Sequence, residues 1–359
     1  MWGCITDVVG LRVGLATDVE GMTGVAVVRF DVPTVASVSV MGGAPGTFGT
    51  EALDPLRNNQ DVHAVVLTGG SVFGLEAVHG VIRCLEEDGI GLSSRSVPIP
   101  IVAGAVLFDL ALGSRYARPD AAMGFSACRI ASREPIACGN RGPGAGASTG
   151  KGRLGRPLKG GLGSASVRLS NGIVVGALVA VNAVGDVINP ASGRFYAHGG
   201  STLECPSAEV MDWDGATGFM GDPTATLSSV GEGHTTIGVV ATNALLDKLQ
   251  LRRMLTQAQH GLSRSIRPVH TSGDGDTLFG ASVGGASRVD LGGVVTGVYS
   301  DVVGAIAADV VARAIVRAML SAESVGRWRS AVEVYPELGG FAVPEGRRSQ
   351  AADGRSELR

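Results

Sequence analysis

Charged and aromatic side chains are scarce in this chain of 359 residues. Charged residues make up 18% and aromatic residues 4%, and the formal net charge is only −3. So small a net charge gives no electrostatic reason to expect a nucleic acid or an anionic membrane as a partner. Apolar residues make up 45% and glycine occupies 55 positions, which predicts a sizeable core with many tight turns. The length suits two ordinary domains or one large layered domain.

Residue patterns typical of metal sites, disulfides and membrane spans are also missing. The 5 cysteines include no C-x-x-C pair, which indicates buried thiols in a reducing compartment. The 6 histidines show no H-x-x-x-H or similar spacing, so we expect no zinc site. The most apolar run, Gly172 to Val184, is too short to span a bilayer, and the N-terminus lacks the regions of a secretory signal. We therefore expect a cytoplasmic protein that does not enter a membrane.

A glycine-rich run from Gly142 to Gly152 matches a phosphate-binding loop only in part. Ala145 stands where the motif requires its first glycine, and Gly152 follows the lysine where a magnesium-binding serine or threonine is required. No strand immediately precedes the run. We therefore expect no nucleotide and no other cofactor. The run still presents Lys151 on a glycine-rich loop, either as a solvated surface lysine or as a functional cation.

Turn signals divide the chain into short strands and helices. The pair Asn171-Gly172 lies between apolar runs and predicts a β-hairpin that joins strands at 164–169 and 173–181. A helix is predicted from Val72 to Asp88, with Ser71 as its N-cap. Two further helices are predicted, at 245–262 and 301–322.

The segment from 190 to 233 has almost no periodicity and ends at a Thr-Thr pair. So long a loop is uncommon inside a compact domain and is usually functional or disordered. Thr235 and Thr236 then open an apolar, β-branched stretch that predicts a buried strand. A hydroxyl at such a junction can attack the carbonyl before it and free its own α-amine, which becomes a general base beside the hydroxyl. The β-propensity of threonine is the alternative explanation of the pair.

Three polar residues elsewhere could take part in such chemistry. Asn182 sits inside an apolar strand, between Val181 and Ala183, where it either caps a backbone group or donates to an oxyanion. Asp274 and Asp276 stand two apart, either as turn residues or as carboxylates that hold the freed amine and hydroxyl of Thr235. The other oxygen ligands of a calcium loop are absent.

Together these pieces resemble the DmpA-type aminopeptidase and nylon-oligomer hydrolase family of N-terminal nucleophile hydrolases. The matching pieces occur in family order and cover most of residues 10 to 320. They are residues 62–75, the loop 144–151, Val181-Asn182, residues 235–243 and residues 267–277.

The resemblance implies an α/β protein with a four-layer α/β/β/α sandwich, made as a precursor that cuts itself. Its subunits would be 1–234, with a linker at about 190–234, and 235–359, with a tail that is disordered from about 345. The cleaved pair would stay together and assemble into a homo-oligomer.

The resemblance also implies roles for individual residues. Thr235 would be the nucleophile, Lys151 and Asn182 would hold the oxyanion and its surroundings, and Asp274 and Asp276 would position the threonine. Two positions depart from the family pattern. His234 replaces the usual asparagine before the nucleophile, which puts the efficiency of self-cleavage in question. Phe108 lacks the hydroxyl that some members carry in this region.

These features predict a self-processing amide hydrolase. The first expectation is an aminopeptidase or amidase-esterase that acts on small peptides or amino-acid derivatives. The second is an endohydrolase of ω-amino-acid oligoamides. An acyltransferase, and an unprocessed pseudoenzyme that serves as an assembly module, are the alternatives.

The two threonines generate the first testable prediction. Neighbouring strand residues point to opposite faces, so only one of Thr235 and Thr236 can face the site. Thr235→Ala should leave a single uncut chain without activity, whereas Thr236→Ala should still be cut. The chains are separated by denaturing electrophoresis and weighed by mass spectrometry. The reverse pattern would move the nucleophile by one residue.

Overall fold

The computed structural model describes residues 2–94, 96–151, 157–197, 234–284 and 296–341. The linker expected at about 190–234 therefore lies mostly outside the described residues, and so does the tail expected from 345. Among the helices of the described ranges, none is both long enough and apolar enough to cross a membrane.

Within the described residues, nine strands form one hydrogen-bonded network in the order β3-β5-β4-β2-β13-β12-β9-β8, with β1 paired to β2. They are β1 (Leu11–Asp18), β2 (Thr23–Val40), β3 (Thr47–Phe48), β4 (Asp61–Thr68), β5 (Val102–Val106), β8 (Gly161–Arg168), β9 (Val174–Asn182), β12 (Thr235–Thr242) and β13 (Thr277–Ser282). Two small ribbons stand apart from this network. They are β6 (Ser148–Thr149) with β7 (Leu158–Lys159), and β10 (Ile188–Asn189) with β11 (Arg194–Phe195).

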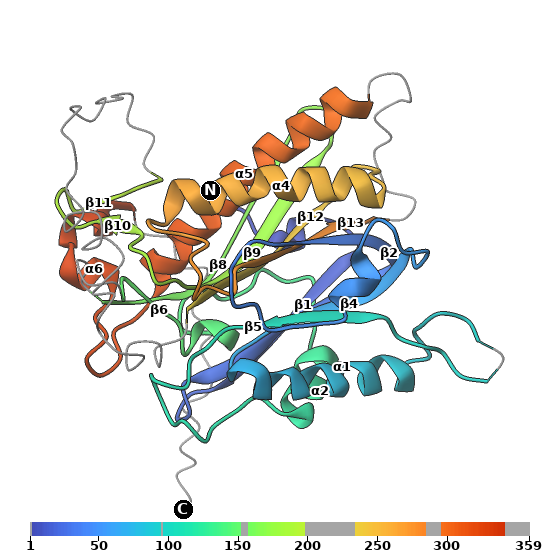
Figure 1. Ribbon diagram of the computed structural model, residues 1–359, viewed down its shortest axis with the longest axis horizontal. Helices are drawn as coiled ribbons and strands as arrows, with labels where there is room; N and C mark the ends of the chain where they lie inside the picture. Colours follow the sequence, from blue (N-terminus) through green and yellow to red (C-terminus); the bar gives the residue numbers. More distant parts are fainter. Residues whose placement is uncertain (1, 95, 152–156, 198–233, 285–295, 342–359) are drawn as a thin grey trace, which may run out of the picture.

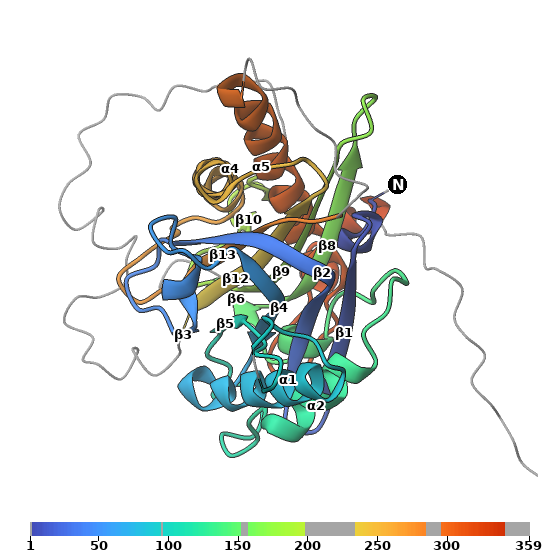
Figure 2. The ribbon, with the colours of Figure 1, turned by 90° about the vertical axis from the view of Figure 1, so that its right-hand side faces the viewer.

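Helices cover both outer faces of the strands, as Figures 1 and 2 show. α1 (Glu76–Glu87) and α2 (Ala121–Arg129) lie on one side, and α4 (Lys248–Ser265) and α5 (Thr296–Ser321) lie on the other. A short α6 (Ala331–Val334) follows α5. The order of layers is helix, sheet, sheet and helix, so the expected α/β/β/α sandwich is confirmed.

Three apolar clusters fill the three spaces between the four layers. Along β9, Val175 and Ala177 pack in the cluster under α4 and α5, while Val174 and Leu178 pack in the cluster between the two sheet layers. Because successive side chains of a strand point to opposite faces, a strand between two cores must be apolar on both. This explains why the whole of β9 is buried.

The long strand β2 connects the two sheet layers. Its first part, Thr23–Phe30, pairs with β1, and its last part, Val35–Val40, pairs with β13. The pairing of β2 with β4 shifts register between Arg29 and Thr34, which marks a bulge or irregularity. Bulges bend a strand and increase its twist, which fits a strand shared by two layers.

Most of the elements predicted from the sequence are present. β8 and β9 are antiparallel neighbours joined through Asn171 and Gly172, as the hairpin prediction requires. α4 and α5 match the two helices predicted near the C-terminus. The prediction for Ser71 is wrong, because this residue has a φ of 54° and starts a 3₁₀ helix, Ser71–Leu75, before α1 begins. No side chain caps either of these two helices.

Three strand ends meet at one edge of the sheet. β12 is antiparallel to β9, with Thr235 opposite Asn182, and parallel to β13, with Ile237 opposite Thr277. The start of β12, the end of β9 and the residues just before β13 therefore meet at one edge of the layer. Thr235, Asn182 and Asp276 therefore lie at this edge.

Candidate active site

Thr235 is the first residue of β12 and is only 5% exposed. Its hydroxyl contacts the carbonyl oxygen of His234, which is the carbonyl that self-cleavage would attack. The backbone N–H of Gly275 donates to that carbonyl oxygen at 3.1 Å and to the Thr235 hydroxyl at 3.2 Å. A Cβ atom on Gly275 would lie 2.7 Å from Thr235 Oγ1, so only glycine brings its backbone this close.

Asn182 is completely buried opposite Thr235, and its side-chain amide is held from both ends. Its Oδ1 accepts from the backbone N–H of Ser148 at 3.0 Å and from Lys151 Nζ at 2.9 Å. Its Nδ2 donates to the carbonyl oxygen of Phe108 at 2.9 Å. These bonds fix the orientation of the amide, with the oxygen toward the glycine-rich loop. The expected pair of Lys151 and Asn182 is therefore in direct contact.

Asp276 anchors the backbone that follows Thr235. Its Oδ1 accepts from Thr236 N at 2.6 Å. Its Oδ2 accepts from His270 N at 3.1 Å and lies 2.9 Å from His270 Nδ1. Because the carboxylate of Asp276 accepts hydrogen bonds, Nδ1 of His270 is assigned as the nitrogen that carries the proton. His270 has a φ of 57°, a left-handed conformation that histidine adopts more readily than most residues.

Asp274 bonds to its own turn. Its Oδ2 accepts from both the backbone N–H and the hydroxyl of Thr271, each at 2.7 Å. Burial raises the pKa of Asp274, and the neighbouring charge of Asp276 raises it further. The two carboxylates therefore differ in position: Asp276 contacts the strand of Thr235, and Asp274 braces the 271–274 turn that presents Gly275.

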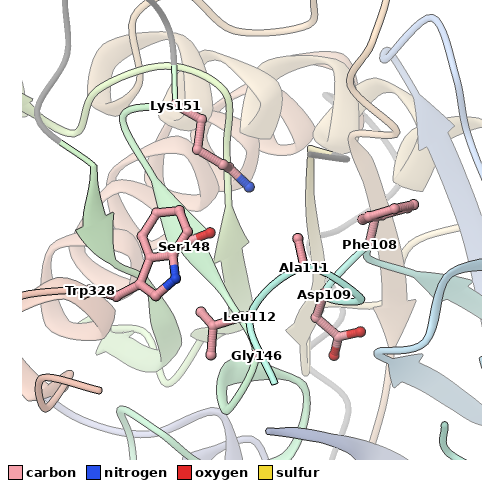
Figure 3. A pocket seen from close by; sticks show the side chains of 8 residues that line it. All are labelled: Phe108, Asp109, Ala111, Leu112, Gly146, Ser148, Lys151 and Trp328. Atoms are coloured by element: carbon pink, nitrogen blue, oxygen red, sulfur yellow. The ribbon is translucent and has the colours of Figure 1, made fainter. Parts of the chain in front are cut away.

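A small pocket is lined by Phe108, Ser148 and Lys151, which all bond to the Asn182 side chain (Figure 3). Its other lining residues are Asp109, Ala111, Leu112, Gly146 and Trp328. Phe108, Ala111, Leu112 and Trp328 make half of this lining aromatic or aliphatic, and the space of about 10 Å³ is near the size of one water molecule.

The one carboxylate in the pocket lining is engaged with the protein. Asp109 accepts from the Thr23 hydroxyl at 2.6 Å and from Gly70 N at 2.7 Å. Burial raises its pKa above the usual range.

Sequence reasoning assigned no role to two groups at this edge. The Gly275 N–H is a backbone donor, and a sequence does not show where a backbone group points. His270 stood within the matching 267–277 segment, but nothing in its spacing indicated that it would bond Asp276. The five residues predicted for the site do gather here: Thr235, Asn182, Lys151, Asp274 and Asp276.

Fold and site together define a class of enzyme. A threonine hydroxyl at the start of a central strand, inside an α/β/β/α sandwich, is the arrangement of an N-terminal nucleophile hydrolase. The L-aminopeptidase D-Ala-esterase/amidase of Ochrobactrum anthropi has a variant of that fold. It superposes with a TM-score of 0.67 at 23% identity, and the match covers 95% of each chain.

The chain belongs to peptidase family S58, whose family model matches residues 3–331. It is 39% identical over 348 residues to an uncharacterized aminopeptidase of Mycobacterium tuberculosis (strain H37Rv), covering 92% of this chain and 98% of the relative. It is 30% identical over 285 residues to the 6-aminohexanoate-oligomer endohydrolase of Kocuria sp. (strain KY2), covering 79% and 75%. The resemblance seen in the sequence is thus confirmed, and the protein is a hydrolase of the peptidase and amidase class.

The partly buried imidazole of His234 generates a prediction about acid stability. Burial, and to a lesser extent the charge of Lys151, lowers the pKa of His234 to about 3, against an unfolded value of about 6.5. The unfolded state therefore binds more protons between these pH values, and stability is lost as the pH falls through this window. At pH 5 the expected loss relative to neutral pH is about 2 kcal/mol.

The measurement is denaturant unfolding at neutral pH and at about pH 5 in the uncut Thr235→Ala background. His234→Asn should reduce the difference between the two pH values. His260→Asn removes an exposed histidine and should keep the full difference. Equal acid sensitivity in all three proteins would contradict the prediction.

Proposed function

We propose that the protein cuts its own chain between His234 and Thr235 and then hydrolyses amides with the freed threonine. The observation that carries this proposal is the contact of the Thr235 hydroxyl with the carbonyl of His234, which also accepts from Gly275 N–H. A nucleophile and an oxyanion donor thus already meet at the bond to be cut. The same edge holds the groups needed for turnover.

Self-cleavage begins when Thr235 Oγ1 attacks the carbonyl carbon of His234. The negative charge that develops on the carbonyl oxygen is stabilised by the Gly275 N–H, which donates to that oxygen at 3.1 Å. The C–N bond then breaks, the nitrogen takes up a proton, and an ester joins His234 to Thr235. Water hydrolyses the ester and releases a carboxylate on His234 and a free α-amine on Thr235.

In turnover the freed amine acts as the general base for its own hydroxyl. The hydroxyl attacks a substrate amide or ester, the amine portion leaves with the transferred proton, and water releases the acyl group. Asn182 supplies a side-chain N–H to the oxyanion, because Ser148 and Lys151 hold its oxygen and so fix its nitrogen. Asp276 fixes the Thr236 backbone beside the nucleophile.

Aminopeptidase or amidase-esterase activity on small peptides and amino-acid derivatives is the first substrate assignment. It is supported by membership of family S58 and by the aminopeptidase names of the mycobacterial relatives. Hydrolysis of ω-amino-acid oligoamides is the second. It is supported by the likeness to the 6-aminohexanoate-oligomer endohydrolase of Kocuria sp..

The proposal predicts two chains, residues 1–234 and 235–359, that copurify as one assembly. Intact mass and N-terminal sequencing of the purified protein give the result directly. Thr235→Ser keeps a hydroxyl and should still be cut, whereas Thr235→Ala should not. A single chain of 359 residues that nevertheless hydrolyses amides would refute the mechanism, and a single inactive chain would indicate an assembly module.

Maturation and turnover should respond differently to loss of the Asn182 amide. Because the Gly275 N–H donates to the carbonyl oxygen of His234, the Asn182→Ala variant should still be cut. Its kcat should fall by about 10²–10³-fold, the usual cost of removing one oxyanion donor. Asn58→Ala, which changes an exposed asparagine, should leave both rates unchanged. The measurements are the rate of appearance of the 235–359 chain and the kcat of fully cut material. Normal turnover of Asn182→Ala would show that the donor lies elsewhere.

A further inference from the structure

A buried lysine lies directly behind the glycine-rich loop of the site. Lys159, the last residue of β7, is 0% exposed. Its Nζ donates to the carbonyl oxygens of Gly144 and Ala147, both at 2.8 Å, and to that of Gly160 at 2.9 Å. Its backbone pairs with Ser148 across the small ribbon of β6 and β7. One side chain therefore ties two points of the loop to the strand beneath it.

Three acceptors at hydrogen-bond distance require three N–H donors. Only the ammonium form of lysine has three, because the neutral amine has two and a lone pair. Two charged groups act on Lys159: Asp109, of opposite sign, and Lys151, of the same sign. Burial lowers the pKa of Lys159 to about 7, with Asp109 raising it and Lys151 lowering it further.

The lysine connects to the proposed oxyanion donor through one peptide group. The carbonyl of Ala147, which accepts from Lys159, and the N–H of Ser148 belong to the same peptide unit. That N–H donates to Asn182 Oδ1 at 3.0 Å. A cation on the carbonyl oxygen polarises the peptide and strengthens the bond that its N–H makes, because hydrogen bonds in a chain polarise one another.

We propose that Lys159 is a positioning residue whose ammonium group holds the 144–151 loop so that Ser148 N–H and Lys151 orient the Asn182 amide. Lys159 does not touch the substrate. It acts through the loop, and loss of its proton removes one of its three bonds to carbonyl oxygens, two of which belong to the loop. Turnover should therefore fall as the pH rises through the pKa of Lys159. The inference rests on the proposed role of Asn182.

The first experiment is the pH profile of kcat and KM for fully cut protein. The unmodified enzyme should lose kcat on the alkaline side well before exposed lysines titrate at about pH 10.4. Lys159→Met keeps the approximate volume and removes the charge. It should lower kcat at neutral pH by less than the roughly 10²–10³-fold that loss of one oxyanion donor costs. KM should change little. Its profile should no longer fall on the alkaline side.

Lys151→Met is the matched control, because it removes the second lysine that could titrate in this region. Its kcat should be reduced, yet the alkaline fall should remain. The inference is overturned if the fall persists in Lys159→Met, if it disappears in Lys151→Met instead, or if the unmodified profile is flat. The last outcome needs no variant, so it decides the matter even if Lys159→Met does not fold.

A second experiment separates this inference from the proposed function. In inactive, uncut Thr235→Ala, the ¹⁵N shift of the Ser148 amide should change with pH at the midpoint of the Lys159 side-chain signal. A Ser148 amide shift that does not change as Lys159 titrates would refute the coupling between Lys159 and Ser148, even if the protein is shown to be a hydrolase. A coupled titration in a protein without amidase activity would instead leave the inference standing and remove the proposed function.

Discussion

The pairing of β12 with β9 is the constraint on which the rest of the site depends. It sets Thr235 opposite Asn182, and the parallel pairing of β12 with β13 sets the segment before Thr277 beside the same point. A shift of one residue would turn every side chain of β12 to the other face. Such a shift is opposed because each apolar side chain of β9 and β12 is close-packed in one of two different apolar clusters. Core packing therefore positions Thr235, the proposed nucleophile.

Much of this arrangement could be predicted from the sequence, since it depends on local patterns. Asn171-Gly172 between apolar runs specified the hairpin of β8 and β9, and the β-branched run after Thr235 specified β12. The layered fold needed the family resemblance, because strand order depends on contacts between distant segments. The prediction for Ser71 failed because the preceding Gly70 has a φ of 82° and the turn carries Ser71 into the left-handed region too.

The groups that sequence patterns could not reveal are those whose role depends on the backbone. Gly275 acts through its N–H and through the absence of a side chain, and both effects require knowing that Thr235 lies against it. Lys159 resembles any surface lysine in the sequence, yet it is fully buried among carbonyl oxygens. Neither a backbone donor nor a buried charge has a sequence pattern of its own, so both appear only when the sheets are assembled.

The site concentrates polar groups where the fold is most apolar, and this has a physical consequence. A buried polar group costs about 1–3 kcal/mol when it is left unpaired, so the amide of Asn182 and the carboxylate of Asp276 need hydrogen-bond partners. The amide of Asn182 and the carboxylate of Asp276 meet this condition with backbone groups of Ser148, Phe108 and Thr236. Those backbone groups belong to loops and strands far apart in the chain. The bonds that make the burial of Asn182 and Asp276 tolerable are therefore the same bonds that orient them for their proposed roles. The stability of the fold and the geometry of the proposed chemistry cannot be varied independently.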